Sequence, residues 1–88
     1  MMQQALGKNK ETVTFYDKVL ALDPDDTNAL YSKGNAFVYL RNYPEAIALY
    51  DKVLATEPTF IGALTSKGNT LYSLGKYEDV IALYDKNV

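Results

Sequence analysis

Three aspartates are the most regularly placed side chains in this chain that could carry acid–base chemistry. Asp17, Asp51 and Asp85 follow one another at equal intervals, and a lysine comes directly after each of them. Catalysis by carboxylates needs the groups to converge in a pocket, whereas this regular spacing places them apart on an outer face. We therefore expect exposed Asp–Lys pairs, each worth about 0–1 kcal/mol, and no enzyme.

The residue types that build most catalytic and metal sites are missing from the composition. The chain contains no His and no Cys. Their absence excludes thiolate nucleophiles, imidazole bases, haem ligation through His and zinc sites of the Cys/His type. It also excludes disulfides, so the chain needs no oxidising compartment. We expect no cofactor, no metal ion and a cytoplasmic location.

A second set of side chains is polar but uncharged, and it is suited to recognition rather than to catalysis. Its members recur at spacings of three and four positions in two segments, which places each group on one helix face. Asn can hydrogen-bond the backbone of an extended peptide, and Tyr supplies a large contact area. The alternative is a solvated face with no ligand. The set consists of Asn28, Tyr31, Ser32, Asn35, Tyr39, Thr65, Ser66, Asn69, Tyr72 and Ser73.

Length and charge narrow the classes of partner. The chain has 88 residues, of which 48% are hydrophobic, so it is one domain at most. Its net charge is -2, and its Lys and Arg residues are scattered. A nucleic-acid-binding protein normally carries a basic patch, so we expect no nucleic-acid partner. No apolar run approaches the roughly 20 residues that span a bilayer, so we expect no membrane partner either.

An internal repeat is the strongest signal in the sequence. Residues 16–21 return as residues 50–55, and the first three of them return again as residues 84–86, so the interval is the same both times. Between residues 27–54 and 61–88, 14 of the 28 aligned positions are identical. Periods of about 34 residues are typical of stacked supersecondary units. The chain is therefore expected to be a repeat protein.

Each repeat is predicted to form two helices. Apolar residues recur at helical spacing, and no segment alternates as a strand would. Asp25, Asp26 or Thr27 can cap one helix, and Pro44 suits the first turn of the next helix. Pro58 ends that helix, because the residue before a proline is pushed out of the α region. The expected helices lie near residues 10–22, 27–41, 44–56, 61–74 and 78–88.

The period and the residues together resemble the tetratricopeptide repeat. The matching positions are Leu30, Gly34, Phe37, Leu40, Tyr43, Ala46, Tyr50, Val53 and Pro58, followed by Leu64, Gly68, Leu71, Leu74, Tyr77, Val80 and Tyr84. The departures are Leu30 and Leu64 in place of Trp, Lys33 and Lys67 in place of Leu, Val80 in place of Ala, and Asn87 in place of an apolar residue. The two glycines are expected to let the paired helix approach closely, and the tyrosines to pack in the core with hydroxyls that reach solvent or a partner.

The resemblance implies an all-α fold, an α-solenoid of antiparallel helix pairs wound into a superhelix with about two and a half repeats. A single domain would cover residues 1–88: a partial repeat over 1–26, mainly its second helix, a complete repeat over 27–60, and a repeat over 61–88 truncated in its second helix. Leu6-Gly7-Lys8 matches Leu74-Gly75-Lys76 at the turn within a repeat. The first helices of such repeats line a concave side, where the polar set above is expected to bind a ligand.

Two functions are compatible with these features. The first is a protein–protein interaction scaffold that takes a peptide or helix of a partner in the concave groove. The second is a structural module that stacks with copies of itself. Some tetratricopeptide proteins bind acidic chaperone tails through a Lys and Asn clamp, but Tyr31 stands where the clamp Lys is expected, which argues against that ligand. A pentatricopeptide RNA binder is disfavoured by the length of the period and by the uncharged face.

Incomplete repeats at both ends predict self-association, as a dimer or an end-to-end stack, because a repeat cannot bury its apolar face alone. The side chains expected to be exposed are Val80, Ile81, Tyr84 and Val88 near one end and Val13, Tyr16 and Leu20 near the other. Lys33 and Lys67 are expected to lay their stems along apolar surface and to expose their amines.

Overall fold

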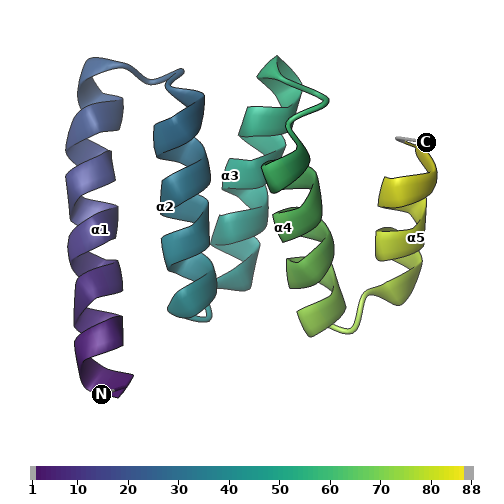
Figure 1. The fold of residues 1–88 in the computed structure, drawn as a ribbon, viewed down its shortest axis with the longest axis horizontal. Helices are drawn as coiled ribbons and strands as arrows, with labels where there is room; N and C mark the ends of the chain where they lie inside the picture. The colour runs from purple at the N-terminus through teal and green to yellow at the C-terminus, as the bar shows by residue number, and fades with distance from the viewer. Residues whose placement is uncertain (1, 87–88) are drawn as a thin grey trace.

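A computed structural model gives the backbone of residues 2–86 and the side chains of residues 8–86, and it is helical apart from short connections. Neighbouring helices run in opposite directions and lie side by side in chain order (Figure 1). The described residues contain no strand, so the prediction of an all-α fold is confirmed. The helices are α1 (Met2–Leu22), α2 (Thr27–Tyr39), α3 (Tyr43–Thr56), α4 (Ile61–Ser73) and α5 (Tyr77–Lys86).

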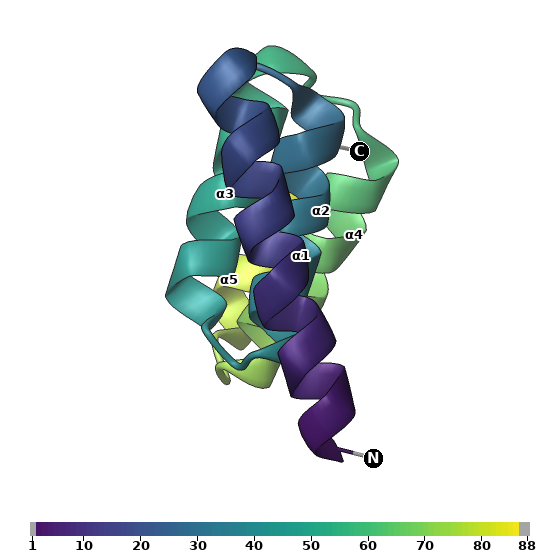
Figure 2. The same ribbon diagram turned by 90° about the vertical axis from the view of Figure 1, so that its left-hand side faces the viewer.

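The last four helices lie within two residues of their predicted bounds, whereas α1 begins well before the predicted start at residue 10. Its first turns extend past the end of α2 (Figure 2). The match of residues 6–8 to the turn at residues 74–76 was therefore misleading. Gly in a helix interior costs only about 1 kcal/mol relative to Ala, and the turn at Gly75 also depends on the packing of α5 against α4. Residues 87–88, and with them Val88, lie outside the described residues.

Local signals define where the helices begin and end. The Asp26 carboxylate accepts a hydrogen bond of 3.1 Å from the Ala29 N–H and so caps α2. After α2 and α4 the chain turns through a left-handed residue, which is Arg41 (φ 63°) in the first case and Gly75 (φ 77°) in the second. A residue in this conformation commonly ends a helix, and glycine adopts it without strain.

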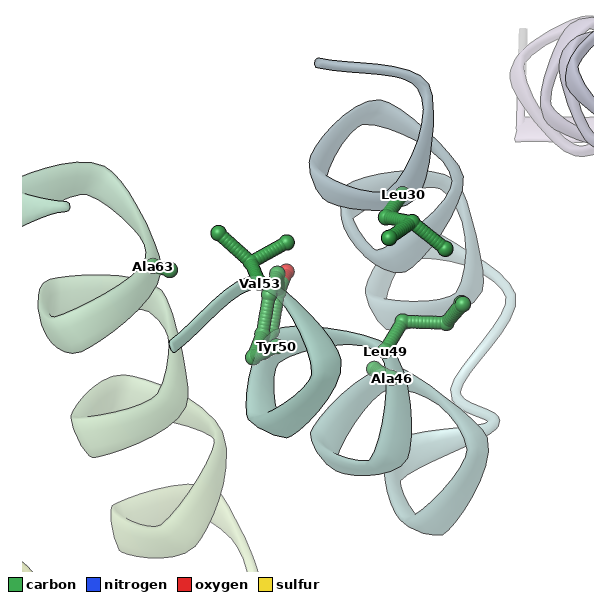
Figure 3. Packing of buried hydrophobic residues seen from close by; sticks show 6 residues of the cluster. All are labelled: Leu30, Ala46, Leu49, Tyr50, Val53 and Ala63. Atoms are coloured by element: carbon green, nitrogen blue, oxygen red, sulfur yellow. The ribbon is translucent and has the colours of Figure 1, made fainter. Parts of the chain in front are cut away.

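The core is centred on α3, which lies between α2 and α4. Tyr50 and Val53 have no exposed surface. Figure 3 shows Leu49 near Leu30 of α2 and Val53 on the side of Ala63 of α4. Most of the buried residues of this cluster lie on α3. Burying each large apolar side chain contributes about 1.5–3 kcal/mol, so α3 holds α2 and α4 together. Within residues 2–86, no helix combines the length and the apolar character needed to cross a bilayer.

Lysines at corresponding positions of α2 and α4, whose amines are expected to be exposed, form ion pairs with the preceding helix. Lys33 Nζ lies 2.6 Å from an oxygen of Asp17 on α1, and Lys67 Nζ lies 2.5 Å from an oxygen of Asp51 on α3. The predicted pairing of each aspartate with the next lysine in sequence is therefore wrong for these two. Adjacent residues of a helix do not face each other, whereas side chains from packed helices do.

The open apolar surfaces differ in part from those predicted. Near the C-terminal end, Ile81 is 61% exposed and Tyr84 is 38% exposed, as expected, whereas Val80 is half-buried. On α1 the three side chains expected to be open, Val13, Tyr16 and Leu20, are half-buried because α2 packs against this helix. Among the side chains of α1 that the structure describes, the large apolar ones that are exposed are instead Phe15 (59%) and Leu22 (90%).

Candidate functional site

A hollow of about 360 Å³, here called the α2–α4 groove, lies where α2, α3 and α4 meet. Helix α2 contacts both α3 and α4, so the groove is set by three helices and not by a loop. Functional side chains on packed helices are held more precisely than side chains on loops. The lining consists of Tyr31, Asn35, Val38 and Tyr39 from α2, Tyr50 from α3, and Ser66, Asn69 and Thr70 from α4.

The structure brings together five of the ten residues that the sequence suggests for ligand binding. These five are Tyr31, Asn35, Tyr39, Ser66 and Asn69. They lie three or four positions apart along α2 and along α4, as predicted, and Asn35 and Asn69 occupy corresponding positions of the repeat. Their part in binding stays a prediction.

The other five predicted residues do not line this groove; they are Asn28, Ser32, Thr65, Tyr72 and Ser73. Ser32 is half-buried, and the rest are exposed. The Tyr72 ring packs against Tyr77 of α5, with 5.1 Å between the ring centroids. The Ser73 hydroxyl donates to the backbone carbonyl of Asn69 at 3.1 Å. Tyr72 therefore packs towards α5 and not into the groove.

Sequence reasoning missed three lining residues. Val38 follows Asn35 by three positions, and Thr70 follows Ser66 by four, so helical spacing alone could have found them. The predicted ligand-binding set covers only part of each helix face. Tyr50 lies in the core, as predicted, and it also lines the groove.

A hydrogen bond from Tyr50 joins α3 to α2 at the groove. The Tyr50 hydroxyl donates to Asn35 Oδ1 at 2.5 Å. Burial raises the pKa of Tyr50 to about 12, against the small lowering by Ser66. The phenol is therefore neutral at physiological pH. The expectation that the core tyrosine hydroxyls reach solvent or a partner is wrong for Tyr50, whose hydroxyl bonds within the chain.

Two tyrosines of α2 play different parts in the groove. The Tyr31 ring lies 5.1 Å from the Phe60 ring and 6.1 Å from the Tyr50 ring, measured between centroids. These contacts fix the Tyr31 ring, which forms one side of the groove. Tyr39 is 69% exposed, so its ring is available to pack against a ligand at little entropic cost.

Among the residues that the structure describes, none with a charged side chain lines the groove. The lysine of α2, Lys33, and the lysine of α4, Lys67, are engaged in ion pairs with Asp17 and Asp51. In the part of the chain that the structure describes, no cluster of three or more His, Cys, Asp or Glu residues could hold a metal ion. The arrangement offers hydrogen bonds and aromatic contacts, and it offers neither a counter-ion nor an acid–base pair.

A second hollow, of about 370 Å³, lies over α5 and the end of α4. It is lined by Tyr72, Tyr77, Val80 and Ile81. Helix α5 has no fully buried residue, and Tyr77 and Ile81 on this surface are exposed. We call it the α5 face.

Comparison with known proteins places the chain in a family of repeat proteins. The family model described as anaphase-promoting complex, cyclosome, subunit 3 matches residues 5–87. Its repeats are of the tetratricopeptide type, which is generally non-catalytic and generally binds proteins. No curated protein matches the chain. Because the match covers nearly the whole sequence, the chain belongs to the family of anaphase-promoting complex, cyclosome, subunit 3, and its helices are tetratricopeptide-type repeats.

Proposed function

We propose that this chain is a protein-interaction module that takes a peptide segment of a partner in the α2–α4 groove. The observation that carries the proposal is the convergence of Tyr39, Asn35 and Asn69 on one hollow of about 360 Å³. An exposed tyrosine and paired amides are the side chains that recognise an extended peptide. The family assignment supports a protein partner in general.

A double substitution in the groove tests this function. Peptides are selected from a random library on the immobilised 88-residue chain, and their affinity is measured by fluorescence anisotropy. Replacing Tyr39 and Asn69 by Ala is expected to weaken binding at least about tenfold, or about 1.4 kcal/mol, because interface anchors carry most of the binding energy. Both residues are exposed, so the fold is expected to be unchanged.

Asn35 is left intact in that variant, because its amide oxygen accepts the hydrogen bond of a buried hydroxyl and its loss would also reduce stability. The matched control replaces Thr56 and Thr59, which are exposed and do not line the groove. Affinity equal to that of the unmodified chain in the Tyr39 and Asn69 variant, with circular dichroism unchanged, would refute the groove as the binding site.

A second candidate function is assembly with copies of the same chain, and the α5 face favours it. Ile81 is 61% exposed, and Tyr77 is 56% exposed. Covering such side chains contributes about 1.5–3 kcal/mol each when burial is complete. A two-fold contact between α5 faces would give a closed dimer, whereas joining the α5 face to α1 of the next copy would give an open stack.

Replacing Ile81 by Glu is expected to dissociate the assembly, raising its dissociation constant by at least about tenfold in sedimentation equilibrium. Replacing Phe15 by Glu on α1 separates the two geometries, because it dissociates only a stack. Replacing Leu22, which is 90% exposed, by Glu is the control for added charge. A folded monomer of the unmodified chain at high micromolar concentration would eliminate this function.

A further inference from the structure

The hydrogen bond between Tyr50 and Asn35 has a direction. A phenol has one proton to donate, and the Tyr50 proton is directed at Asn35 Oδ1. The bond therefore runs from Tyr50 on α3 to Asn35 on α2.

This direction determines what Asn35 offers a ligand. Its amide oxygen is engaged by a hydroxyl that belongs to a completely buried residue. Rotating the amide by half a turn would exchange this acceptor for a donor and break the bond that the Tyr50 hydroxyl donates, which is unfavourable for a buried group. The amide is thus held with its NH₂ group as the part left for a ligand, and that group only donates hydrogen bonds.

The electrostatic character of the groove adds a second constraint. Its eight lining residues include no charged side chain, and the lysine amines of α2 and α4 are paired with aspartates. A charged ligand group that entered would lose water without meeting a counter-ion, which is unfavourable. A peptide carbonyl has the opposite properties, since it carries no net charge and accepts from an amide donor.

We propose that Tyr50 is a positioning residue that holds Asn35 as a hydrogen-bond donor, and that the α2–α4 groove consequently selects an uncharged peptide segment by its carbonyl groups. The proposal rests on the proposed function, because it specifies the ligand of the same groove. Aromatic or small apolar side chains on that segment would pack against Tyr39. The selectivity arises as much from the rejection of charged segments as from attraction to neutral ones.

The test uses peptides selected from a random library on the intact chain, and it compares three variants. Tyr50→Phe keeps the ring and removes the hydroxyl, so the Asn35 amide is free to turn. Asn35→Asp keeps an acceptor for Tyr50 and removes the NH₂ donor. Tyr16→Phe is the matched control, because Tyr16 occupies the position on α1 that Tyr50 occupies on α3 in the repeat and does not line the groove.

The selected peptides are expected to carry no Asp, Glu, Lys or Arg at the positions that contact the groove. Their dissociation constants should rise at least about fivefold in Tyr50→Phe and Asn35→Asp and stay unchanged in Tyr16→Phe. The side-chain amide signals of Asn35 in nuclear magnetic resonance should shift on peptide binding in the unmodified chain. In free Tyr50→Phe those signals should already differ. A purely structural role of Tyr50 would leave the peptide preference and the amide response untouched.

Three outcomes would overturn the inference. Peptides that shift the Asn69 and Tyr39 signals but need a charged residue would disprove the neutral ligand while leaving the proposed function standing. Equal affinities of Tyr50→Phe and the unmodified chain would disprove the positioning role alone. A selection in which no peptide shifts the nuclear magnetic resonance signals of the groove residues would disprove both the inference and the proposed function.

Discussion

Replacing Gly34 by Ala is expected to lower the free energy of unfolding by about 2 kcal/mol, although Ala is the better helix former by about 1 kcal/mol. A Cβ atom at this position would lie 2.8 Å from Cε1 of Tyr50, and two further ring atoms would lie at 3.2 Å. The Tyr50 ring is completely buried among α2, α3 and α4, so it has no free space to move into. Urea unfolding followed by circular dichroism measures the loss.

The corresponding change at Gly68 is the matched control, because the sequence around the two glycines is the same. A Cβ atom there would lie 2.7 Å from Cζ of Tyr84, which is also too close. Tyr84, however, is 38% exposed on a helix without buried residues, and its ring can swing into solvent. We expect Gly68→Ala to change stability by less than about 0.5 kcal/mol. Equal losses at both positions would show that burial of the ring does not decide the cost.

Raising the pH from 8 to 11 is expected to remove about 1.4 kcal/mol of stability through Tyr50 alone. Burial raises the pKa of Tyr50 from 10.0 to about 12 in the folded chain. The folded state therefore holds the phenolic proton more tightly than the unfolded state does. The contribution is complete below pH 10, and it is lost as the pH rises from 10 to 12. Above that range the loss from this group approaches about 2–3 kcal/mol.

The Tyr50→Phe variant isolates this effect, because the other tyrosines and the lysines titrate alike in both chains. The variant should be less stable than the unmodified chain at pH 8 by about 1 kcal/mol, the net worth of a hydrogen bond. At pH 11 the difference should vanish or reverse. The free energy of unfolding in urea at the two pH values provides the measurement. Parallel losses in the two chains would mean that Tyr50 ionises as freely in the folded state as in the unfolded state.

The sequence by itself was enough to predict the helices of the repeat and the faces that they pack with. Helical spacing and the prolines placed four of the five helices to within two residues. The repeated glycine predicted the close approach that the structure shows between Gly34 and the Tyr50 ring. These features are readable because they depend on residues near one another in the chain or on a period that recurs.

The candidate site was predictable only in part. Spacing along α2 and α4 identified five residues that line the groove, including Asn35 and Asn69. Spacing could not reveal that the Tyr50 hydroxyl engages the Asn35 amide, because the two residues lie on different helices. A hydrogen bond between helices depends on their rotation and separation, which the packing of whole side chains determines.

Contacts between helices also account for the other differences between the predictions from sequence and the structure. No neighbour of Lys33 in the sequence indicates a partner for its amine, but the packing of α1 brings Asp17 to it. Phe15 is 59% exposed while Leu49, at the corresponding position of α3, is 8% exposed, because only the latter packs against Leu30 in the core cluster. The sequence determined which residues repeat, and the tertiary structure decided which members of each repeated set are covered, paired or left open, since coverage depends on the helix that lies next to each one.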